Sequence, residues 1–246
     1  MITSSHYALK QKIEFPISIT TLSPLHIGQS DWIGNDESIA EVMKFQKDQE
    51  NIPYIPGSTI KGVFRTHLER ILRNSKLYYA CDPISHSCSG DLKLKTSKAD
   101  SGLCLACFMF GNTQFKGEIS FTDFLPDSNV NLLQKTSTAI TRDNGVAKRG
   151  ALRTVECISP RTKFYGKIII NSDNLLYKGY LAAVIQDLNR QFITIGAFGS
   201  KGFGEIKIDA KKYLKWSPGE INPEVVEIDS LRKTLRKFID EMEESN

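Results

Sequence analysis

Two stretches of the chain alternate apolar and polar residues. In "KIEFPISIT", every second residue from Ile13 to Ile19 is apolar. The stretch "GEISFTDFL" (117–125) shows the same alternation. Because successive side chains of a strand point to opposite faces, each of the two predicts a strand with one buried face. The apolar stretch "FYGKIIIN" (164–171) also predicts a strand.

Apolar residues at spacings of three and four predict helices elsewhere. In residues 58–73 they form one face, made of Ile60, Val63, Phe64, Leu68, Ile71 and Leu72. The segment "NLLYKGYLAAVIQDLNR" (174–190) is also amphipathic. A last helix is expected at about 229–244, after the loop "SPGEINPE".

The remaining segments connect these elements. Residues 29–53 are polar with little periodicity and predict a long loop, and residues 76–111 form a polar insert that contains cysteines. Residues 135–163 predict a long hairpin with "RDNGVAKRG" at its tip, because Asn-Gly favours tight turns. The segment "FITIGAFGSKGFGEIKI" (192–208) predicts a strand, a glycine loop and another strand.

The order of these elements contains two successive strand–helix–strand units, which is the ferredoxin-like order. We therefore expect an α+β fold. The chain has 246 residues, enough to bury a sizeable core. We expect one domain over 1–216, which includes the insert (76–111) and the hairpin (about 128–165), followed by a C-terminal helical extension over 217–246.

Composition and charge favour a soluble protein and permit a nucleic-acid partner. Hydrophobic residues make up 40% and charged residues 24%, and the net charge is +4. No apolar run reaches about 18 residues and the N-terminus lacks the pattern of a signal peptide, so we expect no membrane partner and a cytoplasmic location. Basic residues gather in the hairpin region, among them Arg142, Lys148 and Arg149, which predicts one positive face.

Four cysteines flank the polar insert. Cys104 and Cys107 form a C-x-x-C pair, the spacing that lets two thiolates bind one Zn²⁺, and Cys81 and Cys88 are the candidate partners. His86 is an alternative to either one. A site with four cysteine ligands would be structural rather than catalytic. Free thiols and disulfides are the other interpretations.

Two segments have sequences typical of sites where backbone N–H groups bind phosphate. Pro-Gly precedes the helix at 58–73, Ser58 or Thr59 can cap it, and its free N–H groups attract anions. Lys61 and Arg65 lie one turn apart on its polar face. The glycine loop contains four glycines and Lys201, so a ligand could approach its backbone closely. The simpler interpretations are an ordinary capped helix and a glycine-rich turn.

The long loop and the histidines offer candidate catalytic groups. The loop carries Asp31, Asp36, Glu37 and Glu41, which could hold Mg²⁺ beside a bound RNA or could be solvated acids. The four histidines do not have zinc-protease spacing, and no G-x-S-x-G motif supports a serine nucleophile.

Four motifs together resemble the RAMP superfamily of CRISPR–Cas proteins. They are "LSPLHIG", "YIPGSTIKGVFR", "CLACFMFG" and "GAFGSKGFGEIKI", in an order that covers about residues 13–214. The match is best to backbone subunits of type III (Csm/Cmr-like) effector complexes. The cysteine insert resembles the zinc-bearing branch of that group.

The resemblance implies a modified ferredoxin-like core of the RNA-recognition type, with a long β-hairpin thumb and a zinc-binding insert. Such subunits stack with copies of themselves or paralogues, and with other effector subunits, along a CRISPR RNA that pairs with target RNA. The thumb displaces one base at regular intervals. By this resemblance the RNA-binding candidates are His26, Ser58, Thr59, Lys61, Arg65, Arg142, Lys148, Arg149, Gly199, Ser200, Lys201, Gly202 and Phe203.

Related backbone subunits cut target RNA with a loop aspartate and a divalent metal. Here the corresponding stretch is "SIAEVMK" (38–44), which has no aspartate at the position where those subunits carry it. Asp36, a few residues upstream, is the candidate catalytic residue, with Mg²⁺ or Mn²⁺ as cofactor. Two alternatives stay open. One is a standalone endoribonuclease that processes repeat RNA with a histidine base such as His26 or His67, and the other is a non-catalytic, zinc-stabilised scaffold.

Overall fold

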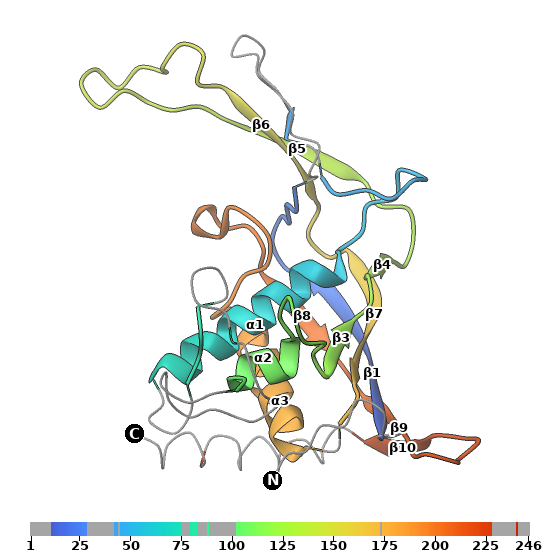
Figure 1. Ribbon diagram of the computed structural model, residues 1–246. Helices are drawn as coiled ribbons and strands as arrows, with labels where there is room; N and C mark the ends of the chain where they lie inside the picture. Colours follow the sequence, from blue (N-terminus) through green and yellow to red (C-terminus); the bar gives the residue numbers. More distant parts are fainter. Residues whose placement is uncertain are drawn as a thin grey trace.

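The computed structural model describes residues 11–28, 42–43, 45–74, 79–82, 88, 102–172, 174–227 and 240. Figure 1 shows the arrangement: a main sheet covered by helices, with a long two-stranded hairpin extending away from it. Asp36, Glu41 and His86 lie outside the described residues, as does most of the helix expected at 229–244.

The ferredoxin-like core is confirmed. Its elements are β1 (Lys12–Thr21), α1 (Gly57–Asn74), β3 (Ile119–Phe121), β7 (Lys163–Ile170), α3 (Leu175–Asn189) and β8 (Ile206–Asp209). In the sheet, β8, β1, β7 and β3 lie side by side, and each neighbouring pair is antiparallel. Two strand–helix–strand units therefore interleave in one sheet, as the order of elements along the chain predicts.

Three further strands complete the main sheet, which has seven. They are β4 (Leu125–Pro126), which pairs with β7, and β9 (Lys212–Trp216) and β10 (Glu224–Glu227), which form a hairpin at the other edge. β8 pairs with the second half of β1 and β9 pairs with the first half. β8 and β9 therefore follow one another along the same edge of β1, and the strand is interrupted between them at 210–211.

The core lies between the sheet and the helices. Ile13, Phe15, Ile17 and Ile19 of β1 are buried, as are Phe64 and Leu68 of α1 and Tyr180 of α3. α1 contacts β3, α3 contacts β8, and the two helices contact each other. A short helix, α2 (Leu105–Phe110), packs beside α1 and is buried throughout. The apolar alternation of the first strand thus marks the face that the helices cover.

The predicted thumb hairpin is present as a separate sheet. β5 (Leu132–Ser137) and β6 (Arg153–Ile158) pair antiparallel, and β2 (Val42–Met43) adds to β6 in parallel. At the tip, Gly145 has a φ of 69°, and its N–H group donates to the carbonyl of Thr141. The Asn-Gly pair therefore turns the chain as predicted.

Three expectations differ from the structure. The strand predicted at 192–196 is wrong: Gln191 and Gly196 both have positive φ, 59° and 74°, so the segment between them bends instead of extending. β10 forms part of the segment for which a helical extension is expected. Finally, α1 begins at Gly57, which places Ser58 and Thr59 inside its first turn rather than at its cap.

Among the described residues, none of the helices is both long and apolar enough to cross a membrane.

Candidate nucleic-acid interface and metal centre

The glycine loop packs against the segment that follows β1. The N–H group of Ala197 donates to the carbonyl of His26 at 3.0 Å, and that of Gly204 donates to Pro24 at 2.9 Å. A Cβ atom at Gly196 would lie 2.2 Å from the His26 oxygen, and one at Gly204 would lie 2.1 Å from the Ile195 oxygen. These two glycines are therefore required by close backbone packing and positive φ, independently of any ligand.

The tip of the loop is the part that is open to a ligand. A single 3₁₀ turn, Gly199–Lys201, lies between Phe198 and Gly202, which both have left-handed backbone conformations. Ser200, Lys201 and Gly202 are exposed, whereas the Phe203 ring is buried. The side chains that the tip offers to solvent are therefore a hydroxyl and an ammonium group.

His26 lies beneath this tip. It is only 3% exposed, its Nδ1 atom lies 2.6 Å from the carbonyl oxygen of Glu156, and its ring lies 5.5 Å from that of Phe198. Because a carbonyl can only accept, Nδ1 carries the proton. The carboxylate of Glu156 accepts in turn from the N–H group of Phe45 at 3.1 Å. His26 thus connects the glycine loop to the base of the hairpin.

A cleft of about 190 Å³ opens between the glycine loop and the base of the hairpin. We call it the hairpin-base cleft. It is lined by Lys135, Thr136, Ser137, Arg153, Val155, Phe198, Lys201 and Phe203. The Lys135 ammonium lies 5.2 Å from the centre of the Phe203 ring, and the Lys201 ammonium lies 5.2 Å from the centre of the Phe198 ring. Three cations and two aromatic rings line the cleft, and none of the described residues that line it is acidic.

Of the eight residues that line this cleft, the sequence identified only Lys201 and Phe203 as binding candidates. Lys135 pairs with Val155, and Ser137 pairs with Arg153, so these four side chains share one face of the hairpin. Strand alternation could have placed Lys135 and Arg153 together. Phe198 carries no comparable signal, because its left-handed conformation (φ of 65°) is rare for an aromatic residue.

The hairpin tip forms a second basic region. Arg142, Lys148 and Arg149 are exposed there, and Figure 1 shows the tip at the far end of the hairpin from the main sheet. No described acidic residue pairs with any of the three. Of the predicted basic RNA-binding residues, these three therefore lie at the tip and Lys201 lies in the cleft, whereas Lys61 and Arg65 lie on α1.

The N-terminus of α1 already has an acidic partner. The N–H group of Gly57 donates to Oδ1 of Asp123 at 2.8 Å, which places a carboxylate at the positive end of the helix. A Cβ atom at Gly57 would lie 2.7 Å from the carbonyl oxygens of Phe121 and Thr122, so only glycine fits there. Ser58 is exposed, and Lys61 is half-buried without a described partner.

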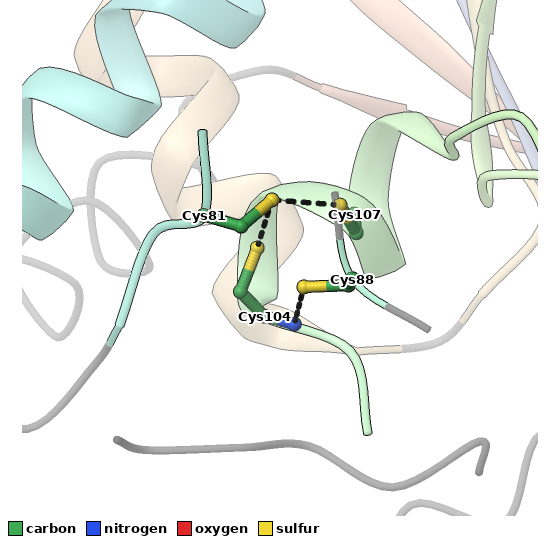
Figure 2. Close-up of side chains that lie close together, drawn as sticks. All are labelled: Cys81, Cys88, Cys104 and Cys107. Carbon is green, nitrogen blue, oxygen red and sulfur yellow. Dashed lines mark hydrogen bonds between the residues drawn. The ribbon is translucent and has the colours of Figure 1, made fainter. Parts of the chain in front are cut away.

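The four cysteines converge in a candidate metal centre, called the metal centre below, which comprises Cys81, Cys88, Cys104 and Cys107. Their sulfur atoms all lie within 4.8 Å of one another, and all four are buried. Cys81 Sγ lies 3.4 Å from Cys107 Sγ and 3.7 Å from Cys104 Sγ. Figure 2 marks both contacts with dashed lines. Tetrahedral zinc with bonds of 2.3 Å would separate sulfur atoms by about 3.8 Å, so the cluster fits such an ion.

The thiols of this cluster differ in acidity. The hydrogen bond from Cys107 lowers the pKa of Cys104 to about 4, whereas burial raises the pKa of Cys81 to about 11. The hydrogen bond to Cys104, together with burial, raises the pKa of Cys107. Ionisation is therefore favoured at Cys104. Ionisation of Cys81 and Cys107 as well would need a cation nearby to offset the additional negative charge.

Arg65 joins α1 to this centre. Its Nη2 atom lies 3.5 Å from Cys107 Sγ, and its Nη1 atom donates to the Gly111 carbonyl at 2.6 Å. Its Nε atom lies 2.7 Å from Oε1 of Glu69. Burial alone would lower the pKa of Arg65, but Glu69 and Cys107 raise it overall. The structure thus places Arg65 at the metal centre rather than on a free polar face of α1.

Comparisons with known proteins agree with this architecture. A structure of the type III-B Cmr-beta complex bound to cognate target RNA contains a chain that matches with a TM-score of 0.55 and 20% sequence identity. The match covers 89% of this chain and 62% of that chain, so the present chain spans less than two thirds of its counterpart. No curated protein matches the sequence. The family model of the RAMP superfamily matches residues 18–207. With that match over most of its length, and with the ferredoxin-like core in place, this chain belongs to the RAMP superfamily.

Proposed function

We propose that this protein is an RNA-binding backbone subunit of a type III CRISPR effector complex. The observation that carries the proposal is the hairpin-base cleft, where Lys135, Arg153 and Lys201 surround two phenylalanine rings. Cations bind phosphates, and the partly exposed Phe198 ring can stack on a base, whereas the buried Phe203 ring lies beneath Lys135. Neither kind of RNA contact depends on sequence. A subunit that must hold any guide RNA needs contacts of this kind.

The hairpin supports the same function. It extends from the cleft, and its tip carries Arg142, Lys148 and Arg149, all exposed. A strand of RNA that follows the glycine loop would meet the base of the hairpin next. We propose that the hairpin is a thumb that inserts between guide and target RNA.

Family membership and fold support this function over a general RNA-binding role. The chain is a RAMP protein, and its fold is similar to a chain in the RNA-bound type III-B Cmr-beta structure. We propose CRISPR RNA and target RNA as ligands and other effector subunits as partners. Copies of this chain or paralogues would stack beside it in a filament. We further propose that the complex is cytoplasmic and serves antiviral defence.

The test is RNA binding by a charge-reversed cleft. Fluorescence anisotropy would compare the wild type with Lys135→Glu/Lys201→Glu, using a labelled single-stranded RNA. The matched control is Arg70→Glu/Lys116→Glu, which changes the net charge equally at exposed positions outside the cleft. We expect the cleft variant alone to lose affinity and to have a shallower salt dependence. Equal affinities of the cleft variant and the control would refute the proposed RNA site.

Zinc is the metal that we propose for the four-cysteine centre. A cluster of sulfur donors selects a soft or borderline cation, and four protein ligands complete a tetrahedron. Zinc bound there would stabilise the fold and would leave no position for a substrate. Its role would be to hold α2 against the end of the insert.

We also propose target-RNA cleavage by Asp36 with Mg²⁺ or Mn²⁺, a hypothesis that rests on the acidic loop and on the family resemblance. The experiment is a cleavage assay of guide-loaded complexes that contain the wild type, Asp36→Ala or Glu41→Ala. Loss of regularly spaced cuts with Asp36→Ala alone would support it. Cuts that persist in both variants would refute it and would leave a scaffold role.

The structure favours the backbone subunit over a standalone endoribonuclease with a histidine base. His26 is buried and bonded to Glu156, and the Nε2 atom of His67 lies 2.9 Å from Asp187. Both candidate bases therefore have structural partners. Metal-independent cutting of a repeat RNA by the isolated protein would instead support that enzyme.

A further inference from the structure

The main sheet carries α1, α2 and α3 on one side only (Figure 1). On the other side of the sheet, the side chains of β1 that point away from the helices are those of Glu14, Pro16, Ser18 and Thr20. Three of the four are short, so they rise little above the sheet. A broad depression of about 780 Å³ opens above these residues. It is lined by residues of β1, β7, β8 and β9 and of the β3–β4 and β8–β9 connections. We call it the sheet-face depression.

Four lysines line this depression and a fifth, Lys207, lies beside it. Lys163 of β7 and Lys207 of β8 both pair with Thr20 of β1, so the three side chains form one row across the sheet. Lys167 lies opposite Pro16, and Lys211 lies at the break between β8 and β9. Lys212 follows directly, and all five lysines are exposed.

Among these lysines, the acids of this face form an ion pair only with Lys167 in the described part of the chain. Glu14 pairs with Lys12 at 2.5 Å and with Lys167 at 3.5 Å, and the hydrogen bond from Lys12 lowers its pKa. Asp123 accepts from Gly57. Asp209 is the remaining acid of the depression. Within the described part of the chain, Lys163, Lys207, Lys211 and Lys212 form no ion pair.

On β7, Tyr165 lies between Lys163 and Lys167 and on the same face of the sheet. It is 46% exposed and lies opposite Ser18 on β1, whose other neighbour is Asp209. Pro16 and Ser18 on the β1 side of it are small, whereas its neighbour on the other side is Leu125 of β4, which is 52% exposed. The ring therefore stands higher than the β1 residues beside it. An aromatic ring in this position on an open sheet is suited to stacking on an unpaired base.

We propose that the sheet-face depression is a second RNA-binding surface, which holds a single-stranded segment through lysine–phosphate contacts and stacking on Tyr165. It extends the proposed function from the hairpin-base cleft to the opposite side of the sheet from the helices, and it rests on RNA being the ligand of this protein. An acidic protein segment would use the lysines but would leave the Tyr165 ring without a flat partner.

The test measures anisotropy of a labelled 30-nucleotide unstructured RNA with the full-length protein. Removing three charges, as in Lys163→Gln/Lys207→Gln/Lys211→Gln, should reduce the slope of log K against log salt by about 2, at about 0.7 per phosphate contact. Tyr165→Ala should weaken binding by about 5-fold to 150-fold, the range of base stacking on an aromatic side chain. Tyr165→Phe should bind like the wild type because it keeps the ring.

The cleft variant Lys135→Glu/Lys201→Glu separates the two proposals. If the sheet-face variants bind RNA as the wild type does while the cleft variant does not, this inference is overturned and the proposed function stands. If neither weakens binding, both are overturned. If the lysine variant keeps RNA affinity but loses self-association in sedimentation, the face is a protein-docking surface and the inference is again overturned. Melting temperatures near that of the wild type show that the variants are folded.

Discussion

Replacing Arg65 with methionine should weaken metal binding as well as stability. The side chain of Arg65 is 17% exposed and that of Glu69 is 9% exposed, so the substitution leaves a nearly buried carboxylate. Its remaining partner is Arg73, whose Nη2 atom is 4.0 Å away. Breaking one side of a buried ion pair costs about 3 kcal/mol or more in unfolding free energy. For a chain of this size that corresponds to a fall of about 6–12 °C in melting temperature.

The effect on the metal follows from the contact with Cys107. Arg65 Nη2 lies 3.5 Å from that sulfur, and Nη1 holds the Gly111 carbonyl at the end of α2. Groups that bond to metal ligands in this way typically change affinity by about 10-fold to 100-fold when they are removed. We therefore expect a loss of zinc affinity of that size, because methionine fills the space but donates no hydrogen bond.

The assay is competition with a chromophoric zinc chelator, accompanied by thermal unfolding. Arg70→Met is the matched control, since Arg70 lies on the same helix but is exposed. Arg65→Lys should retain part of the affinity because it keeps the charge but not the guanidinium geometry. If Arg65→Met and Arg70→Met bound zinc equally, the proposed link between α1 and the metal centre would be wrong.

Three further predictions concern other parts of the chain. Cys104→Ser should lose stoichiometric zinc in elemental analysis and lower the melting temperature, whereas Cys157→Ser, at the buried cysteine outside the cluster, should retain the metal. Gly196→Ala should destabilise the protein by more than Gly202→Ala in urea unfolding. Both have positive φ, but only at Gly196 would the new Cβ meet backbone, at 2.2 Å, so equal losses would contradict the packing argument. Burial lowers the pKa of His67, so its proton is bound more tightly in the unfolded state. Stability should therefore fall as pH drops below the unfolded-state pKa of about 6.5, and less steeply in His67→Gln; identical pH profiles would exclude His67 as the cause.

The sequence predicted those elements whose signal is local. The alternation from Ile13 to Ile19 and the apolar face of residues 58–73 are periodic patterns, and the structure confirms both as β1 and α1. The C-x-x-C pair of Cys104 and Cys107 follows the same logic, because its two sulfur atoms are close in any helical turn. Pattern and spacing are enough where neighbours in sequence are also neighbours in space.

The same patterns were insufficient where backbone conformation depends on distant contacts. Residues 192–196 have the composition of a strand, but positive φ on both sides prevents it. The glycines at 196 and 204 suggested an open ligand loop, whereas they pack against the carbonyls of His26 and Ile195. No local rule identifies which backbone atom will lie opposite a glycine.

The sequence by itself therefore determined the ferredoxin-like order, the hairpin and the chemistry of the cysteines. Only the tertiary structure decided that Arg65 serves the metal centre, that Asp123 occupies the start of α1, and that Lys135 and Phe198 share a cleft. The physical reason is that side-chain periodicity is set by the geometry of a single helix or strand. Contacts between distant segments are instead set by how the sheet, helices and hairpin pack together, which depends on the whole chain.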